Sequence, residues 1–280
     1  MTPKSRLVLS SGQPASPASD PKQPTLEDCP AMTPPPQLTA LADLDSQMAS
    51  AGWAVLDAAS LRELAGLPAG AFAAWPRYWH DLPTDPHMMD GGRYRQRRHS
   101  CFELRPAARM RTVGRRAHWQ PLDYNALHGG IERWFEPMPE TWLQDPAWQA
   151  LLVGLAGLAS RLRGEQAWFV EAHPFRITTE GGIGRPTPEG AHRDGVDLVA
   201  VMLFDRHNIK GGETRVFDAR GPQGMRFTLS EAGSVLLLDD ERVIHESTPI
   251  QPVDSEQPAW RDTLVLTLRG KAFQGPELQS

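Results

Sequence analysis

The sequence predicts a mainly β protein with flanking α-helices, whose antiparallel strands form a sandwich or jelly roll. Three observations lead to this prediction. From about residue 168 onward, apolar residues occur in short β-rich runs rather than at helical spacing. Glycine and proline turns separate these runs, as in all-β sandwiches and jelly rolls. Helical periodicity is concentrated in the part of the chain that precedes them.

The first half contains the predicted helices. Apolar residues at helical spacing favour a helix over residues 38–51 and one or two helices over 139–163. Residues 53–56 form a short apolar run that is typical of a strand. Asp57 follows this run and can cap a helix that begins near residue 58.

The second half contains most of the predicted strands. They cover residues 168–178, 196–204, 215–218, 225–229, 234–238 and 263–268. Residues 187–190 and 208–212 are predicted turns, and the Gly-Gly pair makes the second a candidate hairpin turn.

The composition divides the chain into one domain and two tails. Residues 1–37 contain nine of the 26 prolines together with Ser, Gln and Thr, which predicts a disordered N-terminal tail. Residues 38–272 are predicted to form a single domain, with an N-terminal helical part over about 38–163 and a jelly-roll core over about 164–270. Residues 273–280 are a predicted C-terminal tail.

The overall composition is that of a globular protein of ordinary single-domain size. The 280 residues are 40% hydrophobic and 22% charged, which suits a globular domain with a full core. The net charge of −5 gives no reason to expect nucleic acid, and no apolar run approaches the ~18 residues of a membrane span. With only Cys29 and Cys101, a structural disulfide is not expected, which favours a reducing cytoplasm. The composition contains no signal for an oligomeric state.

One motif points to metal chemistry. His192 and Asp194 are two residues apart, so a strand over 191–206 would direct both side chains to one face. His245 follows 51 residues after Asp194, behind another apolar run. Two histidines and one carboxylate form the facial triad of non-haem Fe(II) oxygenases, which leaves coordination positions open. Zinc is the alternative metal for a histidine-rich site.

Arg261 extends this motif. It follows His245 by 16 residues and precedes a predicted strand. A guanidinium binds a carboxylate through two parallel charged hydrogen bonds, so Arg261 is a candidate anchor for 2-oxoglutarate. The alternative is a surface arginine that pairs with Asp262 or Asp254.

Several longer segments resemble a known family, the bacterial 2-oxoglutarate/Fe(II) dioxygenases related to L-isoleucine 4-hydroxylase. The resemblance covers roughly residues 50–270. The central segments that carry it are Thr187-Pro-Glu-Gly-Ala-His-Arg-Asp-Gly-Val-Asp, Asn208-Ile-Lys-Gly-Gly-Glu-Thr and Asp240-Glu-Arg-Val-Ile-His-Glu-Ser-Thr-Pro-Ile. Earlier segments are Tyr94-Arg-Gln-Arg-Arg, Gln120-Pro-Leu-Asp-Tyr-Asn-Ala-Leu-His-Gly-Gly-Ile and Glu171-Ala-His-Pro-Phe-Arg-Ile. In the last of these, Pro174 stands where the family pattern has a glutamine.

The resemblance implies a cupin-like double-stranded β-helix that binds Fe(II) through His192, Asp194 and His245, and 2-oxoglutarate through Arg261. It further implies that O2 is consumed, with ascorbate as the reductant in vitro, and that 2-oxoglutarate leaves as succinate and CO2. The expected reaction is hydroxylation of an unactivated carbon in a free amino acid or a close derivative. Desaturation, sulfoxidation or a peptide or carrier-bound substrate remain alternatives, as does a cupin-like metal-binding protein without turnover.

Three residues are candidate substrate contacts. Arg98 lies in an arginine-rich strand whose two faces alternate, Asn125 lies in a loop, and Arg176 lies on the strand over 168–178. Each has a structural alternative: a salt-bridged outer strand, a turn, or an ion pair with Glu171 or Glu189. Five other histidines show no ligand spacing and are interpreted as incidental: His80, His87, His99, His118 and His207.

Overall fold

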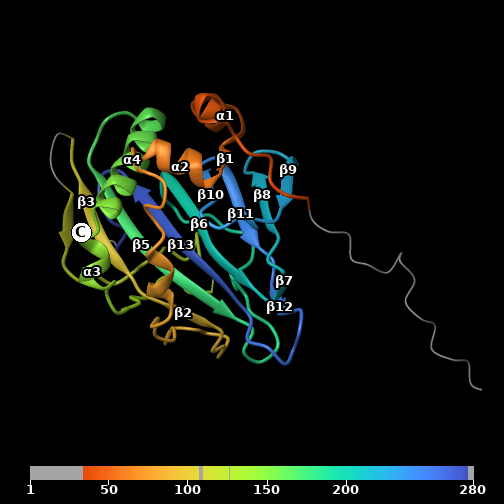
Figure 1. Cartoon of the computed structure of the whole chain (residues 1–280). Coiled ribbons are helices and arrows are strands. Elements are labelled where there is room, and N and C mark those ends of the chain that lie inside the picture. Colours follow the sequence, from red (N-terminus) through yellow and green to blue (C-terminus); the bar gives the residue numbers. More distant parts are fainter. Residues whose placement is uncertain (1–33, 107–109, 126, 277–280) are drawn as a thin grey trace, which may run out of the picture. The chain divides into compact units, whose positions relative to one another are not determined.

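A computed structural model describes residues 34–106, 110–125 and 127–276 (Figure 1). The predicted N-terminal tail lies outside these residues except for 34–37, which have no regular secondary structure. The predicted C-terminal tail is described as far as residue 276 and is irregular there.

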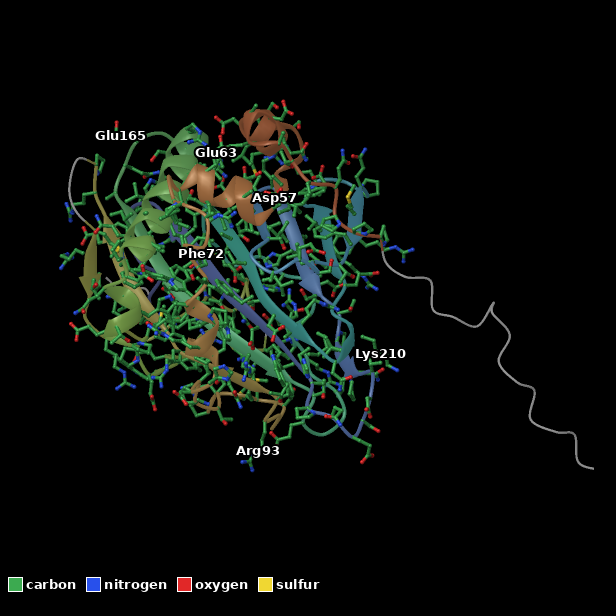
Figure 2. All side chains as sticks on the ribbon, viewed as in Figure 1. Asp57, Glu63, Phe72, Arg93, Glu165 and Lys210 are labelled. Atoms are coloured by element: carbon green, nitrogen blue, oxygen red, sulfur yellow. The ribbon has the colours of Figure 1, made fainter. Side chains whose placement is uncertain are left out.

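The helices precede most of the sheet in the sequence. They are η2 (Leu41–Asp43), α1 (Leu44–Ala51), α2 (Ala58–Leu64), η3 (Trp75–Trp79), α3 (Glu140–Leu143) and α4 (Pro146–Arg163). Asp57 caps α2, because its side chain accepts a hydrogen bond of 2.7 Å from the Ser60 N–H (Figure 2). The predicted cap is therefore confirmed.

The principal sheet contains eight strands. Seven follow the order β1-β10-β6-β13-β5-β3-β4, and β2 also pairs with β5. Their bounds are β1 (Trp53–Leu56), β2 (Arg95–Arg97), β3 (Ser100–Leu104), β4 (Arg111–Val113), β5 (Trp168–Thr178), β6 (Leu198–His207), β10 (Val235–Asp239) and β13 (Trp260–Arg269). All pairs in this sheet are antiparallel.

Two smaller sheets complete the β structure. One has the order β11-β8-β9 and the other pairs β12 with β7. The strands are β7 (Ile209–Gly211), β8 (Thr214–Asp218), β9 (Gly224–Phe227), β11 (Val243–Ser247) and β12 (Ile250–Pro252). In Figure 1, β8, β9 and β11 lie at the right of the view, away from α3 and α4 at the left.

The two faces of the principal sheet pack against different layers. The side chains of β6 alternate between these layers, and Leu198 and Met202 join the helices in one buried apolar cluster. Val199 and Leu203 on the same strand join β8, β9 and β11 in a second cluster. A strand segment buried on both faces must be apolar, which is why residues 198–204 of β6 and 235–238 of β10 are continuous hydrophobic runs.

The observed elements confirm the predicted fold class, a mainly β jelly roll with flanking helices. β1 and β5 occupy the predicted residues. The region 38–163 is less helical than expected, because it also contributes β1 to β4. The predicted hairpin turn over 208–212 is wrong, since residues 209–211 form β7 and pair with β12.

The predicted strand over 191–206 is also wrong in its first part. β6 begins at Leu198, and His192 and Asp194 precede it in a loop. A separate observation concerns membranes: no helix within the described ranges is long and apolar enough to cross one.

Candidate functional site

The loop before β6 meets β11 at a candidate metal centre. His192 and His245 exchange two backbone hydrogen bonds, of 3.0 and 2.9 Å, so the loop extends the edge of β11. The Nε2 atom of each histidine lies 3.8 Å from a carboxylate oxygen of Asp194. One ligand atom from each of these three residues lies within 4.8 Å of the other two. The structure thus brings the predicted triad together.

Two further contacts fix this geometry. The carbonyl of Gly190 lies 2.9 Å from Nδ1 of His192, so this nitrogen donates and Nε2 is left free for a metal ion. The carboxylate of Asp240 accepts the backbone N–H groups of Asp194, Gly195 and Val196 at 3.0, 2.7 and 3.1 Å. These three N–H groups are therefore unavailable to a sheet, which explains why the loop is not part of β6.

Burial and charge shift the protonation of the triad. Burial raises the pKa of Asp194, and the neighbouring Glu189 carboxylate adds to this effect. Burial would lower the pKa of His192, but the charges of Asp194 and Glu189 reverse this and raise it. Burial, followed by the charge of His192, lowers the pKa of His245. A divalent cation would favour the ionised carboxylate and neutral imidazoles that ligation requires.

The triad lines a cavity of about 130 Å³. Its apolar wall includes Phe175, Val201 and Val265. β5 and β13 contribute alternate residues to it, because their side chains point to opposite faces of the sheet. The cavity therefore lies between the principal sheet and β11.

Arg261 on β13 reaches the same cavity. It is 3% exposed, and its Nε has no hydrogen-bond partner among the described residues. Burial, and then the charge of Arg206, lowers the pKa of Arg261 to about 10. The suggested ion pair with Asp262 does not form, since Asp262 binds Arg176 instead. Arg261 is thus a buried guanidinium available to an anionic ligand.

Four further arginines line the cavity: Arg95, which pairs with Asp85, the half-buried Arg269, and Arg97 and Arg133. Arg97 on β2 is 3% exposed and Arg133 is 2% exposed. Among the described residues neither forms an ion pair, and each has an Nε without a hydrogen-bond partner. Arg133 donates to Oε1 of Gln120 at 2.8 Å, and Nε2 of Gln120 donates to Asp194 at 3.0 Å. A chain of contacts therefore links Arg133 to the metal triad.

The cavity wall also includes Glu171 and His173 of β5, together with His118. With His99 behind them, these residues form a second group whose ligand atoms lie within 4.8 Å of one another. His99 and His118, interpreted from the sequence as incidental, both contact Glu171. The pairing of β3 with β5 brings His99 there, whereas His118 lies in a segment that bridges to Arg133.

The three predicted substrate contacts have different positions. Asn125 is 3% exposed and lines the cavity, where it donates to Gln120 at 3.0 Å. Arg98 lies outside the cavity and pairs with Glu136 at 2.8 Å. Arg176 also lies outside it and binds Asp262 through two hydrogen bonds of 2.8 and 2.6 Å.

Strand alternation explains these positions and the residues that sequence reasoning missed. On β2 the side chain of Arg97, rather than that of its neighbour Arg98, points inward, while Arg93 before the strand is exposed (Figure 2). On β5 the inward residues are Phe175 and Ile177, which place Arg176 on the other face. The sequence offered Arg97 as well, because strand alternation placed it on one of the two possible inward faces and Arg98 on the other.

Comparisons with known proteins agree with this geometry. The sequence model of the 2OG-Fe dioxygenase family matches residues 76–267. A crystal structure of a bsmA homologue from Methylobium petroleophilum PM1 is 54% identical, covers 86% of this chain and 98% of its own, and has a TM-score of 0.82. The comparison with curated proteins finds no match.

Two more distant structures share the fold. IDO from Bacillus thuringiensis is 16% identical, with a TM-score of 0.67 and coverage of 84% of this chain and 98% of its own. The Fe(II)/α-ketoglutarate-dependent dioxygenase TqaL is 21% identical, with a TM-score of 0.62 and coverage of 85% and 92%. The family match, the 54% identical structure and the cavity lead to one conclusion: the chain belongs to the 2OG-Fe dioxygenase family and is an Fe(II)- and 2-oxoglutarate-dependent oxygenase.

Proposed function

We propose that this enzyme hydroxylates an unactivated carbon of a free amino acid or a close derivative in the cytoplasm. His192, Asp194 and His245 would hold Fe(II), and Arg261 would bind the distal carboxylate of 2-oxoglutarate. When bound, the metal and cosubstrate supply the activation of O2, and 2-oxoglutarate leaves as succinate and CO2. Two imidazoles and one carboxylate suit this metal, because they leave positions open for the cosubstrate and for oxygen.

The observation that carries the proposal is the surplus of buried positive charge in one cavity. Arg261 accounts for one carboxylate, that of 2-oxoglutarate. Arg97 and Arg133 are buried in the same wall without an ion pair among the described residues. Because an unpaired buried charge is costly, a second carboxylate is the ligand that they favour. An amino acid brings such a carboxylate.

The remaining wall residues would orient the substrate. The apolar side chains of Phe175, Val201 and Val265 suit a hydrocarbon side chain and exclude water from it. Gln120 forms hydrogen bonds with both Asp194 and Arg133. It therefore fixes the guanidinium proposed to bind the substrate relative to the carboxylate proposed to bind the metal. Such fixed positions decide which carbon is oxidised, since small displacements change the outcome.

A turnover assay tests the proposal. Purified protein with Fe(II), ascorbate, 2-oxoglutarate and air is incubated with each of the twenty common amino acids, and succinate and product mass are measured. We expect one or a few amino acids to stimulate succinate formation and to gain one oxygen atom. Background succinate without stimulation by any amino acid would refute the substrate class and would favour a peptide or carrier-bound substrate.

A pair of histidine variants tests the metal assignment. His192→Ala should abolish turnover, because it removes one of three ligands. His207→Ala is the matched control, since His207 is exposed and lies outside the cavity. Near-normal turnover in His192→Ala would contradict the assignment of the triad. Anaerobic addition of 2-oxoglutarate to the Fe(II) protein should produce a visible absorption band in the control and not in His192→Ala.

A further inference from the structure

A ring of imidazoles surrounds one carboxylate beside the metal triad. Oε2 of Glu171 lies 3.0 Å from Nε2 of His99, 2.6 Å from Nδ1 of His118 and 3.7 Å from Nε2 of His173. Glu171 is 7% exposed and lines the cavity. Neither the metal triad nor the binding of 2-oxoglutarate uses this group.

The surroundings favour an ionised Glu171 and neutral His118 and His173. Burial would raise the pKa of Glu171, but the charges and hydrogen bonds of His118 and His99 lower it below its ordinary value. Burial lowers the pKa of His118 to about 3, and it also lowers that of His173. An ionised carboxylate only accepts hydrogen bonds, so the nitrogens of His99 and His118 that face it carry protons.

Arg97 fixes the third histidine. Its NH2 group lies 2.6 Å from Nδ1 of His173, and a guanidinium can only donate. Nδ1 of His173 is therefore the acceptor, and its proton is on Nε2, the nitrogen that faces Glu171. This arrangement also disfavours a metal ion in the cluster, because His173 presents an N–H rather than a lone pair.

The second oxygen of Glu171 is open. Within the described part of the chain, no donor contacts Oε1, whereas Oε2 is surrounded. The same wall contains Arg97 and Arg133, so beside Glu171 it offers a ligand a carboxylate together with two guanidinium groups. This pattern matches a zwitterion better than a simple anion.

We propose that Glu171 binds the ammonium group of the substrate while Arg97 and Arg133 bind its carboxylate. The inference rests on the proposed function and deepens it: the substrate is an α-amino acid whose amino and carboxylate groups are both free. The histidines hold the carboxylate in position, and the apolar wall takes the side chain. An N-acylated or peptide-bound amino acid lacks the ammonium group and would be a poor ligand.

Glu189 is the competing carboxylate. Apart from Asp194, it is the other acidic residue on the cavity wall that the structure describes. Its Oε1 lies 3.5 Å from Nε2 of His192, the nitrogen assigned to the metal. That position places Glu189 against a nitrogen assigned to the metal, although its Oε2 is also buried without a hydrogen-bond partner among the described residues. We assign the ammonium to Glu171, because His173 links Glu171 directly to Arg97, and the variant Glu189→Gln tests the competing assignment.

Anaerobic binding measurements test the inference without turnover. The protein is loaded with Fe(II) and 2-oxoglutarate, and dissociation constants are measured from the change in its visible absorption band. The probes are L-leucine, L-isoleucine and L-methionine, each against the 2-hydroxy acid of the same carbon skeleton and configuration. We expect the wild type to prefer the best-bound amino acid over its hydroxy acid by roughly 10- to 100-fold, the range for hydrogen bonds to charged groups.

The variant Glu171→Gln should reduce this preference to less than about 3-fold, because an amide has no charge to offer an ammonium. Glu171→Asp should restore part of it. The matched control is Glu103→Gln, since Glu103 is buried in the neighbouring strand β3 but pairs with Arg105 and Arg111 outside the cavity. Its preference should equal that of the wild type.

Several results would overturn the inference alone. The first is a wild-type protein that prefers the amino acid over its hydroxy acid by less than 3-fold. The second is an unchanged preference for the amino acid in Glu171→Gln, and the third is a loss of this preference in Glu189→Gln instead. A second bound metal ion that Glu171→Gln removes, measured by metal analysis, would also overturn it. The first result needs no variant and holds even if Glu171→Gln fails to fold. Failure of the proposed function differs: then none of the twenty amino acids stimulates succinate formation by the wild type.

Discussion

Asp240 holds the loop that carries two of the assigned metal ligands, and replacing it by asparagine tests how much that loop matters. The side chain is 1% exposed. Its Oδ2 accepts the N–H groups of Gly195 and Val196, and its Oδ1 accepts that of Asp194. Asparagine has one oxygen, so at least one of these N–H groups would face an amide NH2 group.

Two effects set the size of the change. A buried donor that loses its acceptor costs about 1–3 kcal/mol. Against this, burial and the charge of Asp194 raise the pKa of Asp240 to about 7, so removing its charge relieves some repulsion. We expect a net loss of about 1–2 kcal/mol in the free energy of unfolding. Because the loop orients Asp194, metal affinity should fall more, by roughly 10- to 100-fold.

Competition titration with Co(II) measures this affinity, and denaturant unfolding measures stability. The matched control is Asp239→Asn: Asp239 precedes Asp240 in the chain, is equally buried and pairs with Arg163 away from the triad. The control should lose stability and keep its metal affinity. Equal metal affinities for Asp240→Asn and the wild type would refute the reasoning.

Three further predictions concern the cosubstrate, acid stability and the metal loop. Arg261→Ala should raise the KM for 2-oxoglutarate by roughly 100-fold, because a bidentate charged hydrogen bond is lost; an unchanged KM would move the anchor to another residue. Asp85→Asn should lower the free energy of unfolding at pH 7 by about 3 kcal/mol, since Asp85 forms a buried ion pair of 2.8 Å with Arg95. Burial would raise the pKa of Asp85, but the neighbouring arginines lower it below 3.8, so this difference should persist above about pH 4 and shrink on further acidification; a pH-independent difference in urea unfolding would contradict it. Gly195→Ala should lower the melting temperature and the metal affinity together, because φ is +76° and a Cβ would lie 2.6 Å from Nε2 of Gln274; a variant with wild-type values for both would show that the loop adapts.

The sequence predicted the fold because its strands carry strong local signals. β5 and β1 were located to the residue from their apolar runs, and turns separated most of the others. The loop with His192 was predicted as strand because alternation alone suggested it. What overrides that pattern is Asp240, a residue 46 positions after Asp194 that takes its backbone N–H group.

Some residues of the candidate site could likewise be predicted from local sequence signals, and others could not. The triad and Arg261 could be proposed because a short spacing and a following strand point to them. His118 and Glu171 could not be paired from the sequence, since they are separated by 53 residues and meet only through the tertiary fold. The choice between Arg97 and Arg98 needed the direction of one short strand, which depends on its pairing with β5.

The two backbone hydrogen bonds between His192 and His245 have a mechanical consequence. They join the loop to β11, and a metal ion held by both side chains would link the same two segments in addition to these hydrogen bonds. Metal binding and formation of these two hydrogen bonds are then coupled, so a higher metal concentration favours the hydrogen-bonded state by mass action. Removal of the metal by a chelator should therefore weaken the contact between the loop and β11. Hydrogen exchange at the amide of His245 should become faster when the metal is released.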